Sequence, residues 1–171
     1  MPIPLSLDIS WIRYLLEAAT GVFTGSIFND GSIVQAGHYG ESRNYNDGST
    51  LLQKTHHSLS EVVYQSGLEW RQKHIRQFGG RGVLVIRNPY KAIISYYNFK
   101  QTGGSHTETV AAERFRSAEF REFVRVGAVR WLELIHDWLE FSTDCHIIMY
   151  EVSQSPPLST VLPASNVIIR I

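Results

Sequence analysis

Two short polar segments carry residue types that group transfer requires. The first is Lys54-Thr55-His56, at the end of residues 50–55 (TLLQKT), which are predicted to form a short strand. A histidine can take a proton near neutral pH, and a neighbouring lysine can neutralise charge that develops on a bridging oxygen. A single histidine is more often a surface or structurally satisfied residue, so the triplet fits either role. His57 has no second ligand at a metal spacing, so we expect no metal site.

The second segment is Arg87-Asn88-Pro89, and Ser95 follows eight residues after Arg87. It comes directly after residues 82–86 (GVLVI), a continuous apolar run of the kind buried on both faces of a parallel sheet. Ligands of such sheets bind beyond the carboxyl ends of the strands, where a helix N-terminus offers free amide N–H groups to an anion. The guanidinium of Arg87 would add a positive charge and two parallel hydrogen bonds to the anion, so these residues predict an anion site. The alternative is a structural arginine that caps the neighbouring strand or pairs with a carboxylate.

The elements that must position these residues alternate between helix and strand. Four helices are predicted. One follows Ser10 as its N-cap and another follows Asn88 as its N-cap, and the other two cover residues 61–78 and the amphipathic residues 120–139. The first helix has an apolar face, and its members are Trp11, Tyr14, Leu15, Ala18 and Ala19. Further strand signal lies at residues 145–150, and residues 23–49 are predicted to be loops with little regular structure. This alternation predicts an α/β three-layer sandwich with a central parallel sheet.

Composition limits the class of protein. The chain has 171 residues, 43% of them hydrophobic, and a formal net charge of zero, which excludes the composition of a wholly disordered chain. Cys145 is the single cysteine, so no internal disulfide framework is expected. No apolar run of 18 residues is present and the first residues lack the pattern of a signal peptide, so we expect no membrane segment.

The neutral total hides an uneven distribution of charge. Between Arg71 and Arg130 there are 12 Lys and Arg against 4 Asp and Glu. A basic middle within a neutral chain favours a local anion site over a nucleic-acid surface. Basic residues from Arg114 to Arg130 are interspersed with glutamates, as on a solvated helix face, so we expect no nucleic-acid partner.

Several of these segments together resemble a known superfamily. Lys54-Thr55-His56, residues 83–98 (VLVIRNPYKAIISYYN) and residues 146–151 (HIIMYE) are similar in kind and order to landmarks of the sulfotransferases that use 3′-phosphoadenosine 5′-phosphosulfate (PAPS). Residues 10–26 (SWIRYLLEAATGVFTGS) and 87–93 (RNPYKAI) resemble the sulfotransferase region of the WSC domain-containing proteins. The resemblance covers most of residues 10–151 and implies a sulfotransferase fold related to P-loop NTPases.

The resemblance also implies roles for particular residues. Arg87 and Ser95 match the residues that bind the 3′-phosphate of PAPS, which would be the co-substrate. His56 matches the base that deprotonates an acceptor hydroxyl, here expected on a glycan, and Lys54 matches the lysine that contacts the transferring group. The implied reaction is in-line sulfuryl transfer without a metal. Relatives of this kind work in the Golgi lumen as membrane-anchored proteins.

The two ends of the chain depart from the family pattern. In the family, a glycine-containing phosphosulfate loop ends in Thr-Trp before the first helix; here Trp11 is in register and Ser10 replaces the threonine, but Asp8 and Ile9 precede them. A carboxylate at Asp8 would oppose the 5′-phosphosulfate. We expect residues 1–151 to be a partial sulfotransferase domain, truncated at both ends, and 152–171 a divergent Pro-containing tail. The alternative function is a catalytically impaired module that binds nucleotide weakly or mediates protein interaction.

Overall fold

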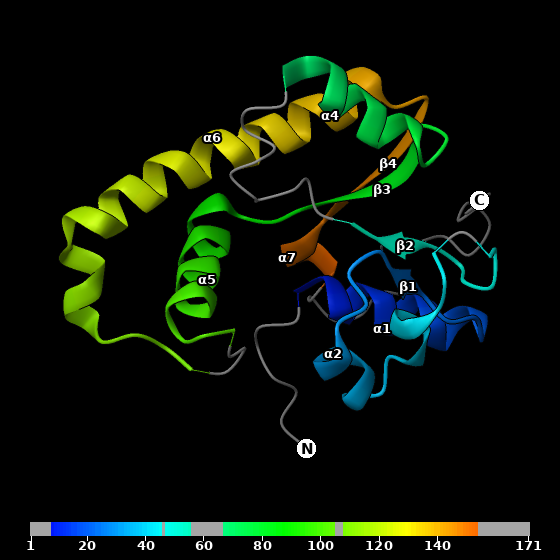
Figure 1. The fold of residues 1–171 in the computed structure, drawn as a ribbon, viewed down its shortest axis with the longest axis horizontal. Coiled ribbons are helices and arrows are strands. Elements are labelled where there is room, and N and C mark those ends of the chain that lie inside the picture. The colour runs from blue at the N-terminus through cyan, green and yellow to red at the C-terminus, as the bar shows by residue number, and fades with distance from the viewer. Residues whose placement is uncertain (1–7, 46, 56–66, 105–107, 154–171) are drawn as a thin grey trace. The chain divides into compact units, whose positions relative to one another are not determined.

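The computed structural model describes residues 8–45, 47–55, 67–104 and 108–153. These residues form two compact units. The N-terminal unit contains residues 8–55 and the second unit contains residues 67–153 (Figure 1). His56, the predicted base, lies outside the described residues.

The N-terminal unit is built around a short parallel pair of strands. Its elements are α1 (Asp8–Thr20), β1 (Gly25–Ser26), α2 (Gly31–Gln35), the 3₁₀ helix η1 (Tyr39–Ser42) and β2 (Gln53–Lys54). In the β1–β2 pair, Gly25 lies opposite Gln53 and Ser26 opposite Lys54. The prediction that residues 23–49 are loops with little regular structure is therefore confirmed only in part, because β1, α2 and η1 interrupt the loops. Of the strand predicted over residues 50–55, only Gln53–Lys54 is confirmed, where β2 forms backbone hydrogen bonds with β1.

Helix α1 buries a different face from the predicted one. Ser10 and Arg13 are buried, whereas Tyr14 is 56% exposed. The prediction of Ser10 as the N-cap was wrong because the helix already includes Asp8 and continues through Ser10. Arg13 points inward because its guanidinium makes hydrogen bonds to Thr24. Polar bonding, rather than apolar periodicity alone, therefore sets the orientation of this helix.

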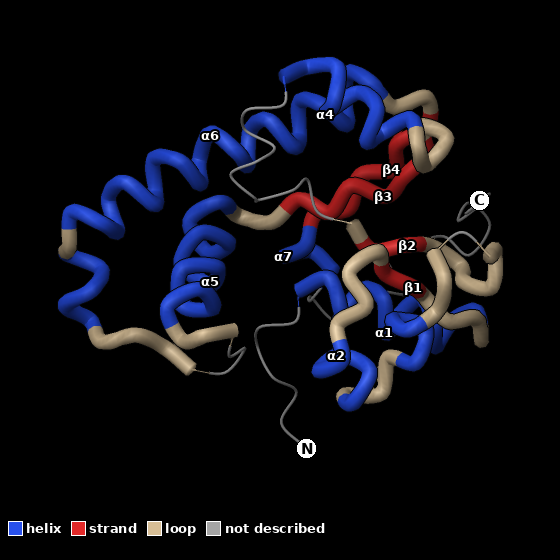
Figure 2. Tube along the Cα trace, in the orientation of Figure 1, coloured by secondary structure: helices blue, strands red, loops and turns tan. Residues whose placement is uncertain are grey.

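The second unit contains a longer parallel pair of strands with helices packed against it. Its elements are α4 (Gly67–Arg76), β3 (Arg81–Ile86), α5 (Pro89–Gln101), η2 (Ala112–Arg116), α6 (Ala118–Phe141), β4 (Asp144–Met149) and α7 (Tyr150–Ser153). Strands β3 and β4 run side by side in Figure 2, with Arg81 opposite Asp144 and Ile86 opposite Met149. The predicted strands at 82–86 and 145–150 are thus confirmed to within one residue at each end.

The core of the second unit forms where α4 and α6 meet β3. Ile75, Leu84 and Trp138 are its buried members. Gly82 lies under the Trp138 ring, so closely that an added Cβ would be 2.5 Å from Cζ3. Of the apolar run at residues 82–86 only Leu84 is buried, so the expectation of burial on both faces was wrong. Among the described residues, β3 pairs only with β4, and the other residues of this run are half-buried.

Aromatic packing fixes α5 against α6. The Tyr97 ring is fully buried and lies 4.8 Å from the ring centroid of Phe120 and 5.1 Å from that of Phe123. Farther along α6, Gly127 lets Ile93 approach, since an added Cβ would be 3.3 Å from Ile93 Cγ1. These contacts hold the helix that begins just after Arg87.

Both units combine helices with small parallel sheets, and the three-layer sandwich stays a prediction. Helix α7 crosses the predicted domain boundary at residue 151, and the tail beyond residue 153 lies outside the described residues. None of the helices that the structure describes is both long enough and apolar enough to cross a membrane.

Candidate functional site

Arg87 lies at the exit of β3, as the sequence predicts. Its guanidinium carbon is 5.2 Å from the centroid of the Tyr150 ring, which follows β4. The backbone carbonyl of Arg87 accepts a hydrogen bond of 3.2 Å from Trp131 Nε1 on α6. Burial lowers the pKa of Arg87, and the nearby Tyr150 and Glu151 oppose that change. A guanidinium remains protonated throughout the physiological pH range, so this strand end carries a fixed positive charge.

The N-terminus of α5 begins as predicted, with Asn88 as the N-cap and Pro89 in the first turn. Asn88 Oδ1 accepts hydrogen bonds from the backbone N–H groups of Tyr90, at 3.0 Å, and Lys91, at 3.4 Å. The backbone N–H of Asn88 itself donates to Glu151 Oε1 at 2.9 Å. Pro89 has no N–H to offer, and side chains of the protein itself already accept hydrogen bonds from the other backbone N–H groups of this turn. The expectation of free amide groups for an anion was therefore wrong.

Glu151 is the one acidic member of this group, and we call Arg87, Asn88, Tyr150 and Glu151 the Arg87 corner. The hydrogen bond from the Asn88 N–H lowers the pKa of Glu151, and the charges of Lys91 and Arg87 act in the same direction, although burial opposes them. The carboxylate is thus ionised and bound at the place where the sequence predicts an external anion. In the sequence, Glu151 stands out only as the last residue of the segment 146–151 (HIIMYE).

Ser95, the second predicted phosphate-binding residue, lies on α5 and is half-buried. It is six residues after Pro89 and therefore about two turns into the helix. Arg87 and Ser95 belong to one continuous β3–α5 segment of the second unit. Their predicted joint role stays a prediction.

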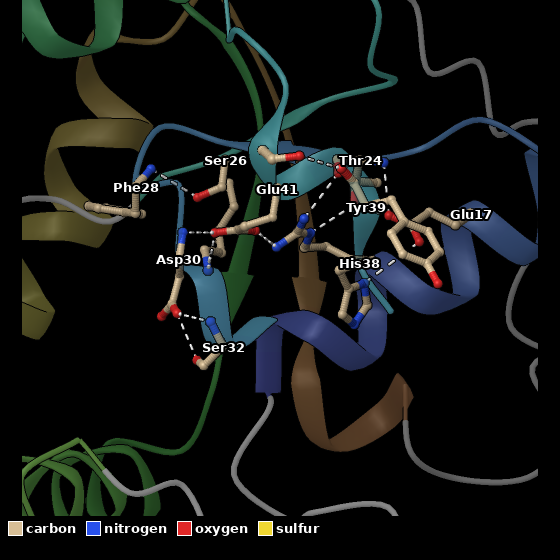
Figure 3. Close-up of polar contacts among 12 residues, drawn as sticks. Glu17, Thr24, Ser26, Phe28, Asp30, Ser32, His38, Tyr39 and Glu41 are labelled. Atoms are coloured by element: carbon tan, nitrogen blue, oxygen red, sulfur yellow. Dashed lines mark hydrogen bonds and ion pairs between the residues drawn. The ribbon is translucent and has the colours of Figure 1, made fainter. Parts of the chain in front are cut away.

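Lys54, in the N-terminal unit, is buried and forms an ion pair with Glu41, whose polar surroundings Figure 3 shows. Its Nζ lies 3.4 Å from Glu41 Oε1 and 5.8 Å from the centroid of the Phe28 ring. Burial lowers the pKa of Lys54 and the Arg13 charge adds to that change, whereas Glu41 raises it. The carboxylate therefore supports a positive charge that burial disfavours. Lys54 is 8% exposed, which leaves little of it in contact with solvent.

Arg13 and Glu41 are the centre of the polar network around Lys54, and no sequence pattern had predicted a role for either of them. Arg13 Nη1 donates to Glu41 Oε2 at 2.5 Å, and both side chains are almost completely buried. Arg13 Nε and Nη2 donate to Oγ1 and the carbonyl oxygen of Thr24, at 2.7 and 3.0 Å. Burial raises the pKa of Glu41, but hydrogen bonds from Arg13 and Ser26 and the charge of Lys54 lower it overall.

The network extends to Glu17 on α1. Glu17 Oε1 accepts hydrogen bonds from the backbone N–H of Thr24, at 2.8 Å, and from its hydroxyl, at 2.5 Å. Glu17 Oε2 lies 3.6 Å from His38 Nδ1. Burial and the Arg13 charge lower the pKa of His38, against the opposing effect of Glu17 and Glu41. We call Arg13, Glu17, Thr24, Glu41 and Lys54 the Glu41 network.

The remaining predicted residues of the N-terminal unit lie on α1. Ser10 is buried, and Trp11 is half-buried with its ring centroid 6.0 Å from that of Tyr14 in a stacked arrangement. The contacts that the structure shows for Lys54 are to Glu41 and Phe28, neither of which the sequence had marked. Among the described residues, no three His, Cys, Asp or Glu side chains gather as a metal site would require.

Comparison with known proteins finds relatives that share one name. The chain is similar to WSCD family members from Aedes aegypti, with 30% identity, and from Drosophila melanogaster and Drosophila pseudoobscura pseudoobscura, each with 31% identity. Each alignment is 146 residues long and covers 83% of this chain and 41% of the relative. The chain therefore spans about two fifths of the length of these relatives. No family model and no solved structure matches the chain.

Proposed function

We propose that this chain belongs to the WSCD family and forms part of a sulfotransferase domain that binds PAPS. In this proposal a hydroxyl group, expected on a glycan, accepts the sulfuryl group. The similarity to three WSCD family members supports the family assignment. The likeness of residues 83–98 to the PAPS-binding segment of sulfotransferases supports the activity.

The observation that carries the proposal is the position of Arg87. A strand of a parallel pair ends at Ile86, Arg87 follows it over an aromatic ring, and a capped helix that carries Ser95 begins two residues later. Phosphate groups bind where a cation meets the end of a parallel strand and the start of a helix. A guanidinium can donate two parallel hydrogen bonds to one phosphate. Arg87 thus fits the 3′-phosphate of PAPS, and Ser95 would add a hydroxyl donor.

The reaction requires one bond to form as another breaks. An acceptor oxygen forms a bond to the sulfur of PAPS, the bond from sulfur to the 5′-phosphate oxygen breaks, and 3′-phosphoadenosine 5′-phosphate leaves. His56 would take the acceptor proton and Lys54 would neutralise charge on the leaving oxygen.

Binding of 3′-phosphoadenosine 5′-phosphate to the full chain, measured by calorimetry, tests the proposal. Arg87→Ala should abolish binding, because the ligand loses its charged partner. Arg81→Ala is the matched control, since Arg81 is an exposed arginine at the other end of the same strand. Equal binding by the Arg87 variant and the wild type would refute the assignment of the 3′-phosphate site.

A second candidate function is a module that binds the nucleotide but transfers no group. The burial of Lys54 against Glu41 favours it, because a lysine that contacts a transferring group must reach that group. Transfer from radiolabelled PAPS to mixed glycans separates the two candidates. The enzyme should show turnover that His56→Ala and Lys54→Ala reduce while nucleotide binding persists. The binding module should show nucleotide binding without turnover.

A further inference from the structure

The strongest unexplained feature outside the predicted site residues is the carboxylate of Glu151. In a capping box, a Glu or Gln three residues after the N-cap accepts a hydrogen bond from the N-cap N–H. The residue at that position in α5 is Lys91, which cannot accept. Glu151, 63 residues away at the start of α7, accepts the Asn88 N–H at 2.9 Å instead. A long-range contact thus replaces the local one.

This replacement places a negative charge where Arg87 and Lys91 both act on it. Both Arg87 and Lys91 interact favourably with the Glu151 charge. An incoming phosphate would interact with the same cations and could accept the same Asn88 N–H, and it carries up to two negative charges of its own. A phosphate and an ionised Glu151 therefore compete for one set of partners.

We propose that Glu151 sets the affinity of the Arg87 corner for its phosphate ligand by acting as a resident anion. This inference rests on the proposed function. The Glu151 carboxylate accepts the Asn88 N–H and interacts favourably with the charge of Arg87, and it opposes a phosphate monoester that approaches Arg87. It is a specificity-determining residue, since it weakens only those ligands that place a phosphate at this corner.

Glu151→Gln separates the charge of Glu151 from its capping role. Glutamine keeps an oxygen that can accept the Asn88 N–H and removes the negative charge. The matched control is Glu140→Gln, which removes an exposed carboxylate from the last turn of α6. Residue 140 precedes β4 and residue 151 follows it, so the two positions are separated by roughly 20 Å of strand.

The test measures the Kd of two nucleotides for the full chain. The probes are 3′-phosphoadenosine 5′-phosphate and adenosine 5′-phosphate, which lacks the 3′-phosphate. Glu151→Gln should bind the first about threefold to tenfold more tightly than the wild type and bind the second with unchanged affinity. Glu140→Gln should match the wild type with both probes. The neutral Glu151→Ser variant gives the same comparison if the glutamine variant unfolds.

Each other result counts against the inference. Equal or weaker binding of 3′-phosphoadenosine 5′-phosphate by Glu151→Gln would overturn it while leaving the proposed function intact. Equal tightening of both nucleotides would also overturn it, since the effect would not depend on the 3′-phosphate. Absence of binding by every folded variant, including the wild type, would overturn the proposed function and this inference together.

Discussion

The two units use arginine in different ways. Arg13, in the N-terminal unit, is 2% exposed and donates to Glu41 and to two oxygens of Thr24. Arg87, in the second unit, is half-buried on an aromatic ring at the end of a strand. A buried guanidinium needs a fixed set of partners, because an uncompensated charge in the interior is strongly unfavourable. The comparison indicates that Arg13 serves the fold, and that Arg87 is the better placed of the two to meet a ligand.

The largest effect on stability is expected from breaking the buried ion pair between Arg13 and Glu41. Arg13→Met keeps much of the side-chain volume and leaves Glu41, with 0% exposure, without its closest cationic partner. Removing one member of a buried ion pair costs about 3–5 kcal/mol. Native-state hydrogen exchange should therefore show a loss of protection in peptides from residues 8–55. Peptides from residues 67–153 report the second unit separately.

An exposed ion pair provides the control for Arg13→Met. Arg114 Nη1 lies 3.8 Å from Glu119 Oε2, and both side chains are about half exposed. Arg114→Met should leave protection in both units unchanged, because exposed pairs contribute little. Similar losses for the two variants would contradict the view that burial gives the Arg13 contact its importance.

The next effect concerns packing in the second unit. Gly82→Ala places a methyl group 2.5 Å from Cζ3 of Trp138, closer than any ordinary contact. Because both residues belong to packed elements, the ring or the strand must shift, at a cost of about 1–3 kcal/mol. Urea unfolding followed by circular dichroism measures the change.

Gly127→Ala is the matched control for this packing prediction. Its added methyl group would meet Ile93 Cγ1 at 3.3 Å, a tighter contact than most but one that a small movement relieves. Alanine in a helix is favoured over glycine by about 1 kcal/mol, which offsets that movement. The unfolding midpoint should stay near that of the wild type. A larger loss for Gly127→Ala than for Gly82→Ala would reverse this assignment of the crowded position.

Local signals account for what the sequence could predict. Asn88 and Pro89 act on their own turn, so the start of α5 followed from residues a few positions apart. The strand at residues 82–86 followed in the same way from its continuous apolar run. Such features depend on neighbours in the chain and need no knowledge of the tertiary structure.

Contacts between distant residues account for what the sequence could not predict. Glu41 lies in a stretch rich in turn residues, and nothing near it indicates that Arg13, 28 residues earlier, is its partner. Glu151 reaches Asn88 across 63 residues and replaces a local capping partner that the sequence lacks. Tertiary contacts also decide which face of α1 is buried. The hydrogen bonds of Arg13 to Thr24 turn the Arg13 face inward and leave Tyr14 exposed.

The smallest effect is the expected change of stability with pH, because burial and hydrogen bonding shift the pKa of Glu41 in opposite directions. Burial raises its pKa, and hydrogen bonds from Arg13 and Ser26 lower it overall from the ordinary value of 4.5. A carboxyl group with a lowered folded pKa contributes stability above its unfolded pKa and loses that contribution as pH falls through the folded value. Glu41→Gln removes this contribution at every pH. The difference in unfolding free energy between wild type and Glu41→Gln, measured with urea, should therefore shrink as pH falls below 4.5.

The acid experiment can also show that the comparison between the units is wrong. Glu113 is an exposed carboxylate in η2 of the second unit, so Glu113→Gln is the control for loss of a carboxylate and should change the free energy of unfolding little at neutral pH. A constant difference between wild type and Glu41→Gln would mean that Glu41 keeps its ordinary pKa in the folded protein. The Arg13 and Lys54 charges would then only offset the cost of burial, with no net stabilisation of the ionised carboxylate, and the Glu41 network would contribute through packing and hydrogen bonds that do not depend on its charge.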